Sequence, residues 1–205
     1  SMFLPRVRQE IASTLFGRLY FGFESSGLGY PSIVFNEGQV GEILTRHHLR
    51  DDSNAQETFV QLCNSTVRLL GERFRFPQVV PRFFEARECN SYEELPRQIR
   101  HYVERASAQQ GFDYDQLKEA ITEAINNNGH AGWLVLTENM DLTILNESDR
   151  SYACPNCSRI HFHGSAGICT HCLEDLTENP NGETAKNIRE NHYYANKTSQ
   201  ERPRI

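Results

Sequence analysis

The chain has 205 residues, of which 38% are hydrophobic and 23% charged, enough for one large domain or for a medium domain with a small one. Its formal charge of −6 excludes a generally basic nucleic-acid coat but leaves room for a local basic face. No apolar run approaches the ~18 residues of a membrane span, and no stretch has the apolar core of a secretory signal. We therefore expect a cytoplasmic protein with no membrane partner.

Residues 1–90 predict a helical and irregular region. A first helix starts near residue 3, with apolar side chains that follow a helical period. These side chains are Leu4, Val7, Ile11 and Leu15. Glycine, serine and proline between residues 25 and 31 predict a turn, and further helices are expected over 37–49 and 55–73. The helix over 55–73 carries an apolar stripe that includes Cys63, so this cysteine is expected in the core.

Residues 91–150 carry the most regular pattern. Ser91 and Glu94 match a capping box that would open one helix, and Asp113 is expected to cap a second. Strand-forming residues at 133–137 and 142–145 then flank a short polar turn, which predicts a β-hairpin. Two helices followed by a hairpin are the order of a winged-helix domain, so the region is interpreted as winged-helix-like.

Four of the six cysteines form two C-x2-C pairs that are separated by 11 residues. They are Cys154, Cys157, Cys169 and Cys172. A C-x2-C turn directs two sulfurs at one ion, and two such turns complete the tetrahedral thiolate shell that Zn²⁺ prefers in closed structural sites. Without a secretory signal, the pattern predicts metal binding in a reducing compartment rather than disulfides. Residues 151–178 are therefore expected to form a zinc ribbon, with a short hairpin between the pairs and one structural Zn²⁺ per chain.

Three histidines lie beside these cysteines: His161, His163 and His171. A mixed shell of histidine and cysteine is an alternative, although four cysteines already close the site. The sequence contains no phosphate-binding GxxxxGK[ST] loop, no DE-x-[DH] run, no GxSxG and no HExxH. We do not expect an active site that lies wholly within this chain.

The last region, 179–205, is polar and predicts a linker or tail with a short helix near 183–192. Such an ending is typical of a segment of a longer protein. For the whole chain we expect an α+β, mostly helical fold with a winged-helix domain followed by a small four-cysteine zinc ribbon.

The cysteine module resembles a zinc-binding insert of very large bacterial DEAD/DEAH-box helicases of superfamily 2. The resemblance rests on the pattern CPxC-x3-HxH-x-SAG-x-CxxC over 154–172 and on an NYYA-like segment, Asn191-His-Tyr-Tyr-Ala195. The segments 14–24 and 27–30 are also similar. Helicases of this type include those of the phage-defence systems Druantia and DISARM and MrfA-like repair enzymes. The resemblance implies an accessory region of an ATP-dependent helicase, with DNA and the flanking motor domains as partners and a role in antiviral defence. The motor motifs are absent, so only zinc ligation by the four cysteines carries over.

The candidate nucleic-acid contacts are the basic residues of the two helices between residues 91 and 128. They are Arg97, Arg100, Arg105 and Lys118. Solvated helix faces beside neighbouring glutamates are the alternative explanation. Three interpretations of the chain therefore stand: a helicase accessory region that guides DNA or braces the motor, a free-standing winged-helix and zinc-ribbon regulator, and a zinc-stabilised protein-interaction module.

Overall fold

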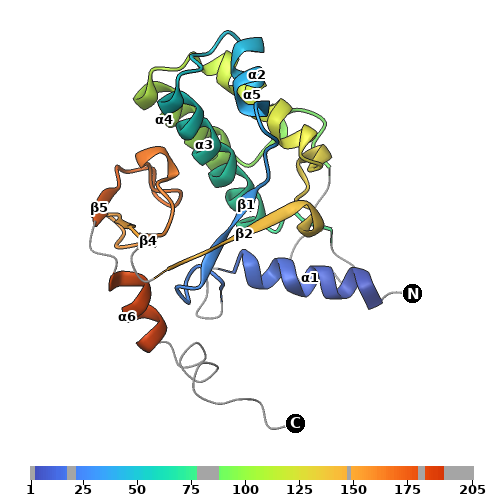
Figure 1. Cartoon of the computed structure of the whole chain (residues 1–205). Helices are drawn as coiled ribbons and strands as arrows, with labels where there is room; N and C mark the ends of the chain where they lie inside the picture. Colours follow the sequence, from blue (N-terminus) through green and yellow to red (C-terminus); the bar gives the residue numbers. More distant parts are fainter. Residues whose placement is uncertain (1–2, 18–21, 78–87, 147–148, 180–182, 192–205) are drawn as a thin grey trace.

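The fold is that of a computed structural model, which describes residues 3–17, 22–77, 88–146, 149–179 and 183–191. These residues form six α-helices and five short strands (Figure 1). The helices are α1 (Phe3–Leu15), α2 (Gln39–Arg46), α3 (Ser53–Glu72), α4 (Arg97–Gln110), α5 (Tyr114–Asn127) and α6 (Glu183–Asn191). The strands are β1 (Gly29–Ile33), β2 (Met140–Ile144), β3 (Ser151–Ala153), β4 (Ile160–His161) and β5 (Thr177–Asn179). The expected α+β, mostly helical class is confirmed.

Helix α3 is the central element, because it packs against β1, α2, α4, α5 and the turn at 165–167. Its N-terminus is capped by Asp52, whose side chain accepts the N–H of Ala55 at 3.0 Å. The predicted apolar stripe is fully buried, and Cys63 lies within it as expected. Near the helix end, a Cβ on Gly71 would fall 2.1 Å from the ring of Phe16, so only glycine allows this ring to approach.

Helices α4 and α5 pack against each other and against α3, with their predicted apolar positions buried. Asp113 caps α5 as expected, since its side chain accepts the N–H of Gln116 at 3.0 Å. The capping box at Ser91 is wrong, because the Ser91 side chain makes no cap bond and α4 begins only at Arg97. Pro96 is the reason: proline disfavours helical backbone at the residue before it, and Leu95 is extended.

The predicted hairpin of 133–137 with 142–145 is also wrong. Strand β2 pairs antiparallel with β1 instead, from Gly29 opposite Ile144 to Ile33 opposite Met140. Short 3₁₀ turns at 131–133 and 137–139 flank the segment that was expected to form the first strand. The side chains of Trp133 and Val135 are buried in the core, so this segment does not pair with β2. Strand β2 pairs with the distant strand β1 instead. The wing of a winged helix is therefore not formed by these residues.

One hydrophobic core runs through the regions that the sequence divides at residue 90 and at residue 150. It extends from Ala12 of α1 through α3, α4 and α5 to Ala166 and Ile168 of the cysteine module. A small second cluster of Leu145, Phe162 and Ala185 attaches α6, which confirms the short helix expected near 183–192. The rest of the expected tail, with most of the NYYA-like segment, lies outside the described residues, as do positions 18–21.

Helix α1 leaves part of its apolar stripe exposed, although Leu15 at its C-terminal end packs against the main core. Leu4 and Ile11 are 56% and 45% exposed, whereas Gln9 and Ala12 of the opposite face are buried. Among the described residues, no helix has both the length and the apolar character that a membrane crossing requires.

Candidate metal centre

The two C-x2-C turns have the same backbone structure. The carbonyl of Cys154 accepts the N–H of Ser158, and that of Cys169 accepts the N–H of Leu173, both at 2.9 Å. A second bond runs from each of these cysteines' own N–H to the carbonyl five residues on, at 2.9 and 2.8 Å. Ser158 and Leu173 both adopt left-handed backbone, with φ of 58° and 66°. Each turn therefore directs its two sulfurs to the same side.

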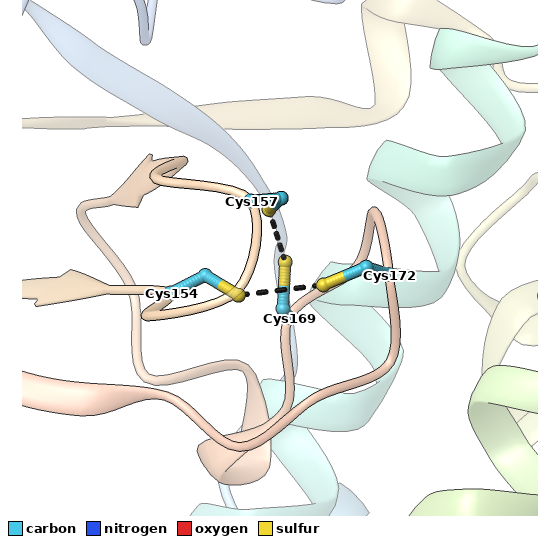
Figure 2. Close-up of side chains that lie close together, drawn as sticks. All are labelled: Cys154, Cys157, Cys169 and Cys172. Atoms are coloured by element: carbon cyan, nitrogen blue, oxygen red, sulfur yellow. Dashed lines mark hydrogen bonds between the residues drawn. The ribbon is translucent and has the colours of Figure 1, made fainter.

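The four sulfurs meet in an interleaved cluster, in which each close pair joins one turn to the other (Figure 2). The Sγ atoms of Cys154 and Cys172 are 3.3 Å apart, and those of Cys157 and Cys169 are 3.6 Å apart. Metal–sulfur bonds of about 2.3 Å in a tetrahedron place sulfurs about 3.8 Å from each other. All four cysteines are free, and their ligand atoms lie within 4.8 Å of one another. The cluster could therefore hold a metal ion.

The four thiols lie in different electrostatic environments. Burial raises the pKa of Cys169 to about 12. Burial also opposes ionisation of Cys172, but hydrogen bonds from the Glu174 backbone and from neighbouring side chains lower its pKa to about 7. Four thiolates at these distances would repel one another, and a bound cation would offset that repulsion.

His161 lies against the cluster. Its Nε2 is 3.3 Å from the Sγ of Cys169, and the residue is fully buried. Burial, together with the nearby Arg68 and Arg159 cations, lowers its pKa to about 2, so the ring is neutral at pH 7. It can donate its Nε2 proton to the sulfur while the four cysteines close the shell. His171 is exposed and belongs to neither cluster of metal-binding side chains found in the described residues.

The predicted hairpin between the two cysteine pairs is wrong. Strand β4 pairs with β3, which precedes the first pair, and β3 pairs on its other side with β5. Residues 165–167 turn away from this sheet and dock on α3. They adopt left-handed backbone at three successive positions, with φ of 47°, 52° and 80°. Left-handed backbone is unfavourable for Ser165 and Ala166, so the surroundings must hold this turn in place.

Buried hydrogen bonds from α3 and α4 provide that support. The hydroxyl of Tyr102 donates to the carbonyl of Ser165 at 3.0 Å, and the Ser165 hydroxyl lies 2.9 Å from that of Ser65. The backbone of Ala166 is held on both sides. Its N–H donates to Gln61 at 2.8 Å, and its carbonyl accepts from Gln110 at 2.9 Å. No local sequence pattern identifies these partners, because they lie 56 to 105 residues from the turn.

The structure does not gather the four predicted nucleic-acid contacts into one free basic surface. Arg105 forms an ion pair with Asp175 of the cysteine module at 3.0 Å. Lys118 lies 3.4 and 3.3 Å from the carboxylates of Glu93 and Asp115. The remaining two contact their own helix or its start: Arg97 donates to His101, and Arg100 donates to the carbonyl of Leu95, both at 3.1 Å.

Comparison of the chain with protein-family models, with curated proteins and with solved structures finds no match.

Proposed function

We propose that the four-cysteine cluster holds one structural Zn²⁺ and that the chain is an accessory, non-motor region of a superfamily 2 DNA helicase. A closed set of four thiolates suits Zn²⁺, which has no geometric preference of its own and accepts a tetrahedral sulfur shell. The four ligands leave no open coordination position, which favours a structural ion over a catalytic one. The helicase part of the proposal rests on the resemblance of residues 154–172.

The docking of the 165–167 turn is the observation that carries the proposed role. This SAG segment belongs to the pattern on which the resemblance rests, and its backbone and hydroxyl are bonded to α3 and α4. Ile168 and Ala166 also enter the main core. The metal ion would therefore stiffen a module that is joined to the helices, as expected of a part that braces a motor.

The ion pairs favour bracing over DNA guiding. Phosphate contacts by free basic side chains supply most non-specific DNA affinity. Arg105 and Lys118 already face carboxylates, and the chain carries a net negative charge. We expect any DNA binding by this chain alone to be no tighter than the non-specific range of about 10⁻⁴–10⁻⁶ M.

A protein-interaction module is the second candidate, and the exposed part of the apolar stripe of α1 favours it. Phe3 is 76% exposed, and Phe3, Val7 and Ile11 line a shallow hollow along the helix. Exposed apolar surface of this kind marks protein contacts in soluble proteins. An exposed apolar surface is compatible with both candidate functions, because an accessory region that braces a motor must also contact the domains that it supports.

Two measurements test the proposal. Elemental analysis of the purified chain should find zinc, and the absence of zinc would overturn the metal assignment. The reading frame around the chain should encode helicase motor motifs on both sides, whereas a frame without them would favour the free-standing regulator or the interaction module.

DNA binding separates the remaining alternatives. In fluorescence-anisotropy titrations at two salt concentrations, the chain should bind weakly at low salt, and replacing Arg97 and Arg100 together by glutamate should weaken binding to every sequence alike. Binding that is tight and sequence-selective would support the regulator. Binding that is absent, or indifferent to the charge reversal, would support an interaction module.

A further inference from the structure

Two buried histidines and a carboxylate form a second cluster beside the cysteines. Ligand atoms of Glu24, His161 and His163 lie within 4.8 Å of one another. His161 is fully buried and His163 is 5% exposed. Nδ1 of His161 and Nε2 of His163 have no hydrogen-bond partner among the described residues, although both atoms are buried. Buried polar atoms nearly always have a partner, so these two nitrogens point to a ligand.

The other nitrogen of each ring does have a hydrogen-bonding partner. Nε2 of His161 contacts the Cys169 sulfur at 3.3 Å, and when Nε2 donates its proton to that sulfur the lone pair of Nδ1 is available. Nδ1 of His163 accepts the N–H of Ser165 at 3.2 Å. Both rings are buried, and neutral imidazole is the form that binds metal ions.

Glu24 is held in place by two contacts of its own. One carboxylate oxygen accepts the N–H of Phe162, the residue between the two histidines, at 3.2 Å. The other oxygen pairs with Arg68, which is itself buried. Glu24 also lines a cavity of about 460 Å³, and His163 lines another of about 340 Å³. Each of these cavities therefore borders one residue of the cluster.

We propose that Glu24, His161 and His163 bind a divalent transition-metal ion next to the cysteine cluster. Imidazole and carboxylate donors suit Zn²⁺, Fe²⁺ and Co²⁺, and two imidazoles with one carboxylate leave coordination positions for water or a substrate. The site is distinct from the four-cysteine centre, because none of its three ligands is a cysteine, and one nitrogen of His161 contacts the Cys169 sulfur while the other has no partner among the described residues.

The charges near the site balance when both ions are present. A Zn²⁺ bound by four thiolates carries a net charge of −2, which a second divalent ion would cancel. The buried cation Arg68 pairs with Glu24, and Arg159 pairs with Glu72, so these four groups add no net charge. This balance rests on the proposed zinc centre. Because Nδ1 of His163 accepts from Ser165, the ring proton is on Nε2; binding a metal through Nε2 moves this proton to Nδ1, so the Ser165 bond is lost and the ring or the Ser165 N–H must turn away.

Cobalt binding distinguishes the two centres, because Co²⁺ bound by thiolates gives intense charge-transfer absorption and Co²⁺ bound by imidazole and carboxylate does not. The metal-free chain is titrated with Co²⁺ alone, and bound metal is counted after desalting. We expect two equivalents per chain, with the thiolate bands complete after only one of them. A chain that completes its thiolate bands and retains one equivalent would overturn the second site and leave the cysteine centre standing.

Two variants test which residues bind the second equivalent of Co²⁺. His163→Gln and Glu24→Gln should each retain one Co²⁺ with unchanged thiolate bands, whereas the control His171→Gln should retain two. Glu24→Gln also leaves Arg68 without its partner, so His163→Gln is the decisive variant if Glu24→Gln fails to fold. Retention of two equivalents by folded His163→Gln would overturn the assignment. Uptake of one equivalent without thiolate bands, abolished by His163→Gln, would support this site and contradict the cysteine centre.

Discussion

Replacing Tyr102 with phenylalanine tests whether the cysteine module is fastened to the helices as the structure indicates. The tyrosine is fully buried, and its hydroxyl contacts both the carbonyl and the hydroxyl of Ser165 at 3.0 Å. The variant keeps the ring, so it removes these two contacts without opening a large cavity.

The size of the expected destabilisation depends on the hydrogen bonds that Ser165 keeps in the variant. Its carbonyl still accepts the N–H of Ile168 at 3.1 Å, and its hydroxyl still contacts Ser65 at 2.9 Å. Neither group is left wholly unpaired, so the loss is that of ordinary neutral hydrogen bonds, about 1 kcal/mol each. We expect the free energy of unfolding to fall by about 1–2 kcal/mol, which lowers the Tm by about 2–8 °C for a chain of this size.

Urea unfolding followed by circular dichroism measures this change. Tyr152→Phe is the matched control, because it deletes the same atom from the partly exposed strand β3 and should change stability by less than about 0.5 kcal/mol. The Tyr102 variant should also release its metal faster to a chelator, since the turn before Cys169 is held less firmly. A Tyr102 variant as stable as the control would refute the idea that this hydroxyl fastens the module.

Three further predictions concern the metal, a buried histidine and a packed glycine. Cys169→Ser should abolish the thiolate–Co²⁺ absorption and lower the Tm, because the folding of small metal modules depends on the ion. Burial lowers the pKa of His130 to about 4, whereas an unfolded histidine titrates near 6.5. The unfolded chain therefore gains a proton first as the pH falls, so stability present at pH 7 is lost between about pH 6.5 and 4. The contribution of His130 to this loss should reach about 2 kcal/mol at pH 5, and urea unfolding at both pH values should show a loss that is smaller by about this amount in His130→Asn. Gly71→Ala should destabilise the fold by about 1–3 kcal/mol in thermal unfolding, because the new methyl group overlaps the Phe16 ring. The control Gly41→Ala meets only the flexible end of a glutamine and should be neutral or stabilising.

Features that depend on neighbours close in the chain can be predicted from the amino-acid sequence. The apolar periods of α3 and α5 and the cap at Asp113 follow from spacings of three or four residues, and the structure confirms them. The cysteine spacing likewise identified the cluster, because each pair lies within one turn and the two turns are 11 residues apart. The prediction of a helix start at Ser91 was wrong, because Pro96 disfavours helical backbone at Leu95 and α4 begins only at Arg97.

Contacts between distant segments are known only from the folded chain. Strand β2 pairs with β1 across more than one hundred residues, Ser65 meets Ser165, and Glu24 meets the two histidines. Local propensity marks a segment as a strand or a turn, but its partner is selected by the burial and hydrogen bonding of the whole chain. The partly exposed stripe of α1 shows the same limit: its period predicts a helix, while the choice of buried face depends on what the rest of the chain presents to it.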